Sequence, residues 1–404
     1  MCFIAIYGAL AMGMGLLLES GIWLRRMGGN LKLAAGFSRV GSRLHDFGVD
    51  HLVERYASVG EALASPWPEG GRMGYPARPE MGAATFHEPV LLPEVLELLA
   101  VKPGQVVVDA TVGGAGHAEK LCERVGPAGQ VIGLDRDPEA HAEAEARLKA
   151  YRDRLVLIQA NFARLGTVLD GLSVAKIDSV LLDLGTSLHQ LKSAKRGFGF
   201  GQEGPLDMRM DPAEARGAKE LLQELSLAEL ERNFRQAGEG RWARPIARAI
   251  IRRREEGRPP ETTTELARLV EAVIPRRAWP REIHPATKTF LALRLLVNQE
   301  IESLEAGLRQ IPGRLKPGGR VAVLTYHSLE DRVVKDFFRE EARGCICPPQ
   351  LPVCRCGRKP RLRVLTRRPV RPGPEEIERN PRARSAKLRA AEKVSPELEQ
   401  GDQP

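Results

Sequence analysis

The stretch VVVDATVGGAGH at residues 106–117 is the most informative segment of this chain, because a buried β-strand runs directly into a glycine-rich turn. Three further strand patterns follow it, at residues 131–135, 155–162 and 177–183. Strands that alternate with helical patterns predict a parallel sheet with right-handed crossovers. Ligands of an open α/β sheet bind beyond the carboxyl ends of its strands. The strand-end acids Asp109, Asp135 and Asp183 should therefore face one crevice.

The glycine turn distinguishes between two classes of cofactor that use this architecture. A dinucleotide site needs the spacing G-x-G-x-x-G, and counting from Gly114 the third glycine would fall at Glu119, whose carboxylate would repel a pyrophosphate. Asp135 follows the turn by about 20 residues, where a carboxylate can accept both ribose hydroxyls. Asp109 and Asp183 add negative potential that favours a sulfonium cation. The pattern favours S-adenosylmethionine over a nicotinamide. The other interpretation is an α/β domain with incidental acids.

At 404 residues the chain is long enough for more than one domain. The expected parts are a core with the cofactor site over residues 81–211, an inserted all-helical subdomain over 212–285, the second part of the core over 286–342, a basic region over 343–393 and a tail over 394–404. Ala286 to Ile311 is expected to form one long helix, and a fifth strand is expected over 320–325. The predicted fold class is thus a Rossmann-like α/β sheet with a helical insertion.

Residues 1–80 differ from the rest of the chain. The apolar run over residues 1–24 carries Glu19 and has no preceding cation, so it matches neither a secretory signal nor a membrane span. We expect this N-terminal extension to be disordered, or to result from a translation start assigned upstream of Met81 or Met73. A weak membrane association is the remaining alternative.

The formal charge of +9 is unevenly distributed. Residues 343–393 hold 15 Lys and Arg against 4 Asp and Glu, which indicates a polyanionic partner such as nucleic acid. A second basic feature is a stripe at near-helical spacing within the insertion, formed by Arg241, Arg244, Arg248 and Arg252. Such a stripe can follow a phosphate backbone. A solvated basic surface is the alternative for both features.

Four of the six cysteines form one cluster in sequence, at Cys345, Cys347, Cys354 and Cys356. In a cytoplasmic type of enzyme, such a cluster favours a structural zinc site over disulfides. The C-x-C spacing is not the usual C-x2-C, so free thiols on a loop remain an alternative.

Short motifs along the chain occur together in one known family. They are H-x2-V-L-L at residues 87–92, D-A-T at 109–111, G-H at 116–117, D-R-D-P at 135–138, D-L-G at 183–185, R-G-F at 196–198, G-P-L-D-M-R-M at 204–210, H-P-A-T at 284–287, H-S-L-E-D-R at 327–332 and N-P-R-x-R-S-A-K-L-R at 380–389. By these motifs, residues 85–393 resemble the RsmH (MraW) family of 16S ribosomal RNA (cytosine-N4)-methyltransferases.

The resemblance implies a class I fold and methylation of a cytidine N4 amine in the decoding centre of 16S ribosomal RNA, in the cytoplasm, with S-adenosylmethionine as donor. The cofactor positions that it implies are Ala115, Gly116, His117, Asp135, Phe162, Asp183 and Gln190.

The target amine needs hydrogen-bond acceptors, because positive charge develops on its nitrogen as the methyl group arrives. The catalytic candidates are Asp183 and the carbonyl of Gly185, with a proton-shuttling role considered for His327, although Ser328-x2-Asp331 is also an ordinary N-cap pattern. The aromatic that stacks on the target base is expected among Phe198, Phe200 and Tyr326. Competing hypotheses are an oxidoreductase, a noncatalytic RNA-binding protein and a DNA-directed N4 methyltransferase. The last of these would be expected to carry an N/D-P-P-Y/F/W motif that this chain lacks.

Overall fold

The structure is a computed structural model that describes residues 16–17, 23–24, 89–281, 283–348 and 353–395. The chain divides into two compact units, Met1–Ala84 and Thr85–Pro404. The described residues of the first unit form an antiparallel pair, β1 (Leu16–Leu17) and β2 (Trp23–Leu24). The remaining residues of the range 1–80, on which the predictions for the N-terminal extension depend, lie outside the described residues.

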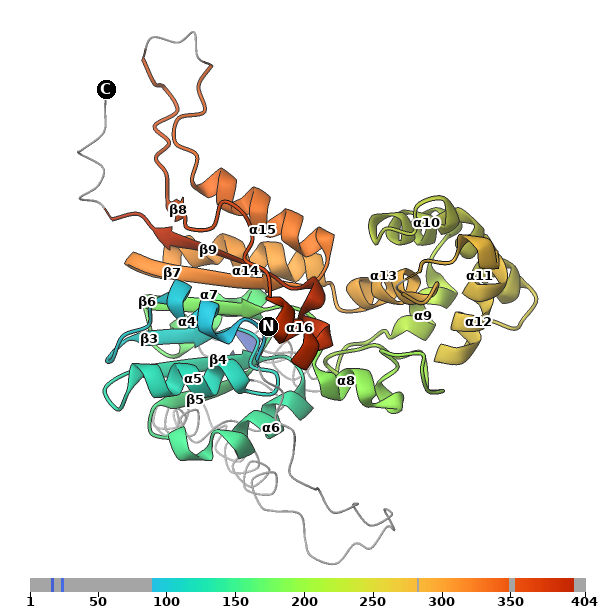
Figure 1. The fold of residues 1–404 in the computed structure, drawn as a ribbon, viewed down its shortest axis with the longest axis horizontal. Coiled ribbons are helices and arrows are strands. Elements are labelled where there is room, and N and C mark those ends of the chain that lie inside the picture. The colour runs from blue at the N-terminus through green and yellow to red at the C-terminus, as the bar shows by residue number, and fades with distance from the viewer. Residues whose placement is uncertain (1–15, 18–22, 25–88, 282, 349–352, 396–404) are drawn as a thin grey trace, which may run out of the picture. The chain divides into compact units, whose positions relative to one another are not determined.

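A seven-stranded sheet forms the centre of the second unit (Figure 1). Its strands are β3 (Val106–Asp109), β4 (Gln130–Asp135), β5 (Leu155–Gln159), β6 (Ile177–Asp183), β7 (Leu315–Thr325), β8 (Leu362–Val364) and β9 (Lys387–Lys393). They lie in the order β5-β4-β3-β6-β7-β9-β8. The first five are parallel, as predicted, and β9 runs antiparallel to both of its neighbours.

Helices cover both faces of this sheet, which explains why its strands are apolar at consecutive positions. Val108 and its neighbours on one face pack against α7 (Leu165–Gly171), α14 (Glu300–Arg314) and α15 (Ser328–Glu341). Val107 and its neighbours on the other face pack against α4 (Leu92–Leu99) and α5 (Gly116–Val125). Helix α6 (Pro138–Arg147) follows β4.

The predicted helical subdomain follows β6 and has its own apolar core. After the short α8 (Leu188–Lys192), the predicted range 212–285 contains α9 (Ala218–Glu224), α10 (Leu227–Gln236), α11 (Ala243–Glu255) and α12 (Thr263–Val273). Helix α13 (Thr287–Val297), which lies beyond that range, packs into the same core. The core includes Phe234, Ile246, Ile250, Leu266, Val270 and Phe290. In Figure 1 these helices lie beside the sheet and do not cover either of its faces.

The prediction of one helix over residues 286–311 is wrong, because the chain breaks between α13 and α14. Gln299 adopts a left-handed backbone with φ 47°. The buried side chain of Asn298 accepts a hydrogen bond from the Met210 amide at 2.7 Å and donates one to the Met208 carbonyl at 2.7 Å. The break therefore fixes the loop that contains the motif at residues 204–210.

The basic region over residues 343–393 contributes to the sheet, which the sequence analysis did not predict. It contains β8, α16 (Pro374–Arg379) and β9, whose residues Leu388 to Ala391 are buried against β7. Lys387 and Arg389 form ion pairs with Asp331 of α15 at 3.1 and 2.6 Å. These two cations pair with a carboxylate of the fold itself, and RNA contact by the basic region stays a prediction.

Candidate active site

The sheet brings the three predicted strand-end acids to one edge. β3 lies between β4 and β6, so Asp109, Asp135 and Asp183 end three adjacent parallel strands. The turn after β3 leads into α5. This edge is where an open α/β sheet binds its ligands.

The turn between β3 and α5 is held by Asp135 and has an unusual backbone. The Gly113 amide donates to Asp135 Oδ2 at 2.8 Å. Ala115 is buried and has φ 63°, a conformation that costs energy for a residue with a side chain and that clusters at functional sites. α5 begins at Gly116, where a Cβ would lie 3.2 Å from the ring of Pro89. The close approach explains why a glycine stands at that position.

A chain of polar side chains connects the turn to the ends of β6 and β7. His117 Nε2 lies 3.1 Å from the Val90 carbonyl, and its Nδ1 lies 3.4 Å from Asp183 Oδ2. The hydroxyl of Tyr326 donates to Asp183 Oδ1 at 2.8 Å. The Asp183 carboxylate is thus oriented from both sides while a quarter of its side chain stays exposed, at 25%.

Burial and charge perturb the titration of this network. Burial raises the pKa of Asp109 to about 7, and the charge of His117 only partly opposes this. Burial by itself lowers the pKa of His117, but the hydrogen bond and charge of Asp183 outweigh it, and the pKa is raised. Burial, followed by the charge of Asp183, raises the pKa of Tyr326 well above its usual value. Tyr326 therefore remains a hydrogen-bond donor at neutral pH.

Asp135 and the neighbouring Asp137 have different surroundings. Asp135 is half-buried, and its Oδ1 accepts from the Asp137 amide at 2.9 Å. Asp137 is 1% exposed and forms a two-pronged pair with Arg196 at 2.8 and 3.2 Å. Arg196 also donates to the carbonyls of Arg209 and Met210. Sequence reasoning missed this pair, although both residues lie in motifs that it had noted.

Two other predicted cofactor residues have structural contacts. Gln190 is buried, donates to Asp137 Oδ2 at 2.6 Å, and accepts from the Ser187 amide at the start of α8. Phe162 is half-buried in a short 3-10 segment after β5, and a Cβ on Gly307 of α14 would lie 2.8 Å from its ring. Their cofactor contacts stay predictions.

The catalytic candidates Gly185 and His327 are both neighbours of Tyr326. Gly185 lies near its ring in space, and His327 follows it directly in sequence. Gly185 has φ 110°, and a Cβ there would lie 3.4 Å from ring atom Cδ2 of Tyr326. His327 is the N-cap of α15, because its Nδ1 accepts from the Glu330 amide at 3.4 Å. Its Nε2 lies 3.0 Å from Glu330 Oε1 without the alignment of a hydrogen bond. The prediction that Ser328 caps this helix is therefore wrong by one residue.

The three aromatic candidates differ in how they are packed. Phe198 is 6% exposed within the helical core. Phe200 contacts His284 and Phe290, with ring centroids 4.6 and 4.8 Å apart. Only Tyr326 of these three hydrogen-bonds to a strand-end acid.

The carboxylates at this edge suit a cationic cofactor such as S-adenosylmethionine. Asp109 Oδ2 is buried and has no hydrogen-bond partner among the described residues, so an acceptor is free for a cationic group such as an ammonium. The other two acids add negative potential beside it, which suits a positively charged sulfur. The carboxylates of Asp135 and Asp183 beside the turn, with Glu119 where a dinucleotide site has its third glycine, would repel a phosphate.

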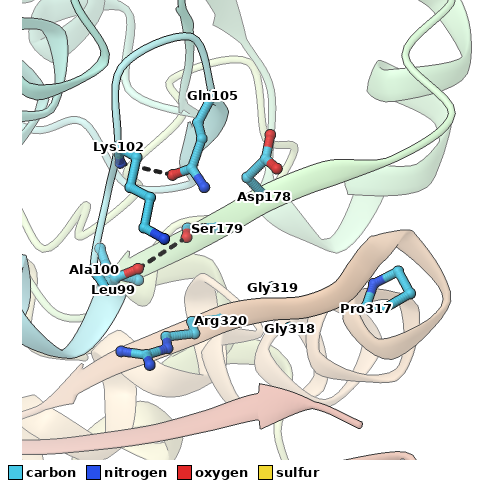
Figure 2. Close-up of a pocket in the computed structure, with 10 residues that line it drawn as sticks. All are labelled: Leu99, Ala100, Lys102, Gln105, Asp178, Ser179, Pro317, Gly318, Gly319 and Arg320. Carbon is cyan, nitrogen blue, oxygen red and sulfur yellow. Dashed lines mark hydrogen bonds between the residues drawn. The ribbon is translucent and has the colours of Figure 1, made fainter. Parts of the chain in front are cut away.

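A pocket at the opposite, amino end of the strands is lined by polar groups that hold the fold together (Figure 2). Asp178 accepts from the Val106 amide at 2.9 Å and from Lys316 at 2.8 Å. Ser179 donates to the Leu99 carbonyl at 3.2 Å. These polar groups are engaged in holding the starts of the strands together, so the carboxyl edge is the better candidate site.

The order of five parallel strands followed by an antiparallel β9 between β7 and β8 defines the fold as that of the class I S-adenosylmethionine-dependent methyltransferases. The model of the MraW methylase family matches residues 84–394, so the chain belongs to this family. Both the predicted fold class and the family resemblance are confirmed.

Named relatives match this chain over nearly their whole length. The chain is 52% identical over 308 residues to Ribosomal RNA small subunit methyltransferase H of Trichlorobacter lovleyi, covering 76% of this chain and 98% of the relative. It is 51% identical over 308 residues to the protein of that name from Geobacter sulfurreducens, covering 76% and 99%. A solved rRNA methylase of Streptococcus thermophilus aligns with 75% of this chain and 94% of its own at 12% identity and a TM-score of 0.34. None of the helices among the described residues has both the length and the apolar character needed to cross a membrane.

Proposed function

We propose that this protein transfers a methyl group from S-adenosylmethionine to the N4 amine of a cytidine in the decoding centre of 16S ribosomal RNA, within the cytoplasm. The observation that carries the proposal is the Asp183 carboxylate, which His117 and Tyr326 hold at the end of β6 with part of it exposed. The names of relatives that match over nearly their whole length support small-subunit ribosomal RNA as the substrate.

The cofactor-binding roles follow from the position of each residue. The turn of Ala115, Gly116 and His117 would hold the amino-acid end of S-adenosylmethionine, beside Asp109. Asp135 would accept the ribose hydroxyls, since each of its oxygens has a lone pair beyond the one used by the backbone. Phe162 would lie along the adenine. Gln190 would support the site through Asp137. The bound cofactor supplies an electrophilic methyl group.

The protein's chemical task is to hold and deprotonate a weak nucleophile. The lone pair of the cytosine N4 is delocalised into the ring, so the amine must be positioned and its protons must be accepted. We assign the Gly185 carbonyl as a hydrogen-bond acceptor for the amine and the Asp183 carboxylate as the group that accepts its proton. Tyr326 would fix Asp183 by its hydroxyl and offer its ring to the base. His327 would act by capping α15.

The target base must leave any stack to reach this edge, which favours a single-stranded or loop target. The stripe along α11 and the 3-10 segment before it offers a surface for the flanking phosphates, because its arginines are exposed: Arg241, Arg244, Arg248 and Arg252. The opposite face of the helix is buried in the helical core. We therefore propose that the helical subdomain contacts the RNA.

Mass mapping of 16S ribosomal RNA tests the proposal. A strain that lacks this gene should have lost one methyl group from a decoding-centre cytidine. The wild-type gene should restore it, and a gene with Asp183→Asn should not. The control Asp153→Asn removes a carboxylate that is 57% exposed and pairs with Arg154, and it should restore methylation. An unchanged methylation pattern in the deletion strain would exclude this substrate.

A separate measurement distinguishes the enzyme from a noncatalytic RNA-binding protein. Calorimetric titration with S-adenosylmethionine should detect binding to the wild-type protein and to the Asp183→Asn variant. Binding without any transfer to small-subunit RNA would support the noncatalytic alternative. Transfer to DNA would instead support the DNA-directed alternative.

A further inference from the structure

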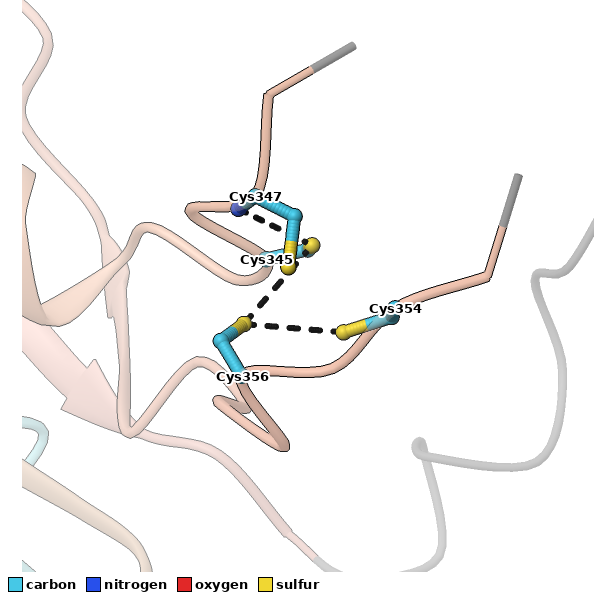
Figure 3. Close-up of side chains that lie close together, drawn as sticks. All are labelled: Cys345, Cys347, Cys354 and Cys356. Carbon is cyan, nitrogen blue, oxygen red and sulfur yellow. Dashed lines mark hydrogen bonds between the residues drawn. The ribbon is translucent and has the colours of Figure 1, made fainter. Parts of the chain in front are cut away.

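Four cysteine side chains meet in the connection between α15 and β8 (Figure 3). Cys345 and Cys347 follow the end of α15, and Cys354 and Cys356 precede β8. The sulfur atoms of all four lie within 4.8 Å of one another. Two of the distances are 3.5 Å, between Cys354 and Cys356, and 3.7 Å, between Cys345 and Cys356.

These distances match a single tetrahedral metal ion. Sulfur ligands at about 2.3 Å from a zinc ion in tetrahedral geometry lie about 3.8 Å apart. A disulfide would require about 2 Å between two sulfurs. Backbone amides also point at the sulfurs, with Cys347 donating to Cys345 at 3.4 Å and Arg355 donating to Cys347 at 3.4 Å. Such hydrogen bonds orient metal-bound thiolates and spread their charge.

The connection has little else to hold its outer part together. Its apolar side chains Ile346 and Val353 are 46% and 70% exposed, so they form no core. Its base is closed by ion pairs between Glu341 and Arg361 and between Glu340 and Arg358. The Glu340–Arg358 pair lies at the surface and is of a kind that stabilises a fold only slightly, whereas Glu341 is buried. The cysteine cluster joins the two described segments farther from this base.

We propose that Cys345, Cys347, Cys354 and Cys356 bind one zinc ion in a closed structural site. All four ligand positions are filled by protein, which leaves none open for catalysis. The ion would fix the path of the chain between α15 and β8. A zinc ion with four thiolates carries a net charge of about −2, and Arg343 and Arg355 supply positive charge within the same segments. This proposal does not depend on the RNA substrate.

Metal analysis of the full chain, purified without a histidine tag, tests the site. Inductively coupled plasma mass spectrometry should find about one zinc per chain after dialysis against a weak chelator. Cys345→Ser and Cys354→Ser should each lose most of this zinc. The control Cys122→Ala should retain it, because Cys122 is buried against the sheet and lies outside the cluster. Cobalt exchanged into the wild type should give the visible spectrum of a tetrahedral thiolate site.

Limited proteolysis supplies a readout that does not require activity. Trypsin should cut at Arg355 or Arg358 roughly tenfold faster after the zinc is removed, because metal binding and local order are coupled. Cleavage at the exposed Arg248 of α11 should not change. S-adenosylmethionine binding should also persist in both serine variants, which separates this test from that of the proposed function. Wild-type protein with no metal and four freely alkylated thiols, with iron instead of zinc, or with disulfides by intact mass would each overturn the proposal.

Discussion

The hydroxyl of Tyr326, just after β7, donates a 2.8 Å hydrogen bond to Oδ1 of Asp183, the last residue of β6. The other carboxylate oxygen of Asp183 lies 3.4 Å from His117 Nδ1. Three segments that are far apart in sequence thus determine the direction of one carboxylate. An acceptor aimed in advance needs no reorganisation when charge develops on the substrate, which is the main advantage of such a site.

Tyr326→Phe should slow methyl transfer about 10- to 100-fold, because a hydrogen bond to a charged group contributes about 1.5–3 kcal/mol. Binding of S-adenosylmethionine should change little. Single-turnover transfer to small-subunit RNA measures the rate, and calorimetry measures the affinity. The control Tyr151→Phe removes a hydroxyl that bonds to Glu123 on an exposed surface. Wild-type rates in Tyr326→Phe would show that the orientation of Asp183 does not limit the reaction.

Asp135→Ala should weaken S-adenosylmethionine binding about 10-fold or more, because it removes charged acceptors for the ribose. The same carboxylate holds the Gly113 and Asp137 amides, so the turn could also change. Asp135→Asn keeps one oxygen acceptor, and its affinity should lie between the two. Calorimetry with all three proteins checks the order. Equal affinities would contradict the ribose assignment.

The pKa of Asp109 should make stability depend on pH. Its pKa is about 7 in the folded protein against 3.8 for the ordinary group, so the folded state retains a proton that the unfolded chain releases above pH 4. The resulting stabilisation is complete below pH 4 and is lost as the pH rises to 7. The raised pKa of His117 acts in the same direction.

Asp109→Asn cannot release this proton. Between pH 5 and pH 7 the free energy of unfolding of the wild type should therefore fall by about 2 kcal/mol more than that of the variant. Urea denaturation of both proteins at the two pH values measures the difference. Parallel changes in the two proteins would mean that Asp109 is ionised throughout this range.

The parallel core could be predicted because its strands are apolar at several consecutive positions, and three of them end in an acid. β9 could not, because its Lys387 and Arg389 resemble a solvated basic run until Asp331 is placed beside them. The end of α13 was missed for a similar reason, since Asn298 breaks the helix through bonds to a distant loop. Local sequence patterns do not report such long-range pairing.

In the candidate site, too, local patterns could be predicted from the sequence and long-range contacts could not. The three acids were found because each ends a strand, and the strand order then brings them together. The links from His117 and Tyr326 to Asp183 depend on how β6, β7 and the first turn lie in space. No spacing in the sequence indicates these links or the pairing of Asp137 with Arg196.

Arg196→Met should destabilise the protein by about 3–5 kcal/mol, because it leaves the buried Asp137 carboxylate without a counter-charge. Asp137→Asn combined with Arg196→Met should recover part of the loss. Urea denaturation compares these variants with Arg216→Met, which breaks an exposed pair with Glu224 and should cost less than about 1 kcal/mol. Similar losses for Arg196→Met and Arg216→Met would show that the buried pair is not a special support of the site.

The exposed arginines of α11 should contribute to RNA affinity through phosphate contacts. Neutralising Arg244, Arg248 and Arg252 to Gln should weaken binding and reduce the slope of log affinity against log salt by about 2, since each contact to single-stranded RNA contributes about 0.7. Arg254 is left in place because it donates to the carbonyls of Gln223 and Leu225 and supports the subdomain.

A matched control for these arginines removes three exposed positive charges from the other part of the chain. Arg152, Arg309 and Lys335 are suitable, with side-chain exposures of 62%, 67% and 41%. Changing these three residues to Gln lowers the net charge by the same amount as the α11 variant does. If the α11 surface binds RNA specifically, the control variant should change the salt slope much less than the α11 variant. Filter binding to small-subunit RNA over a range of salt concentrations measures both slopes. If the two triple variants lose the same slope, the arginines act only through net charge, and the helical subdomain does not follow the RNA backbone.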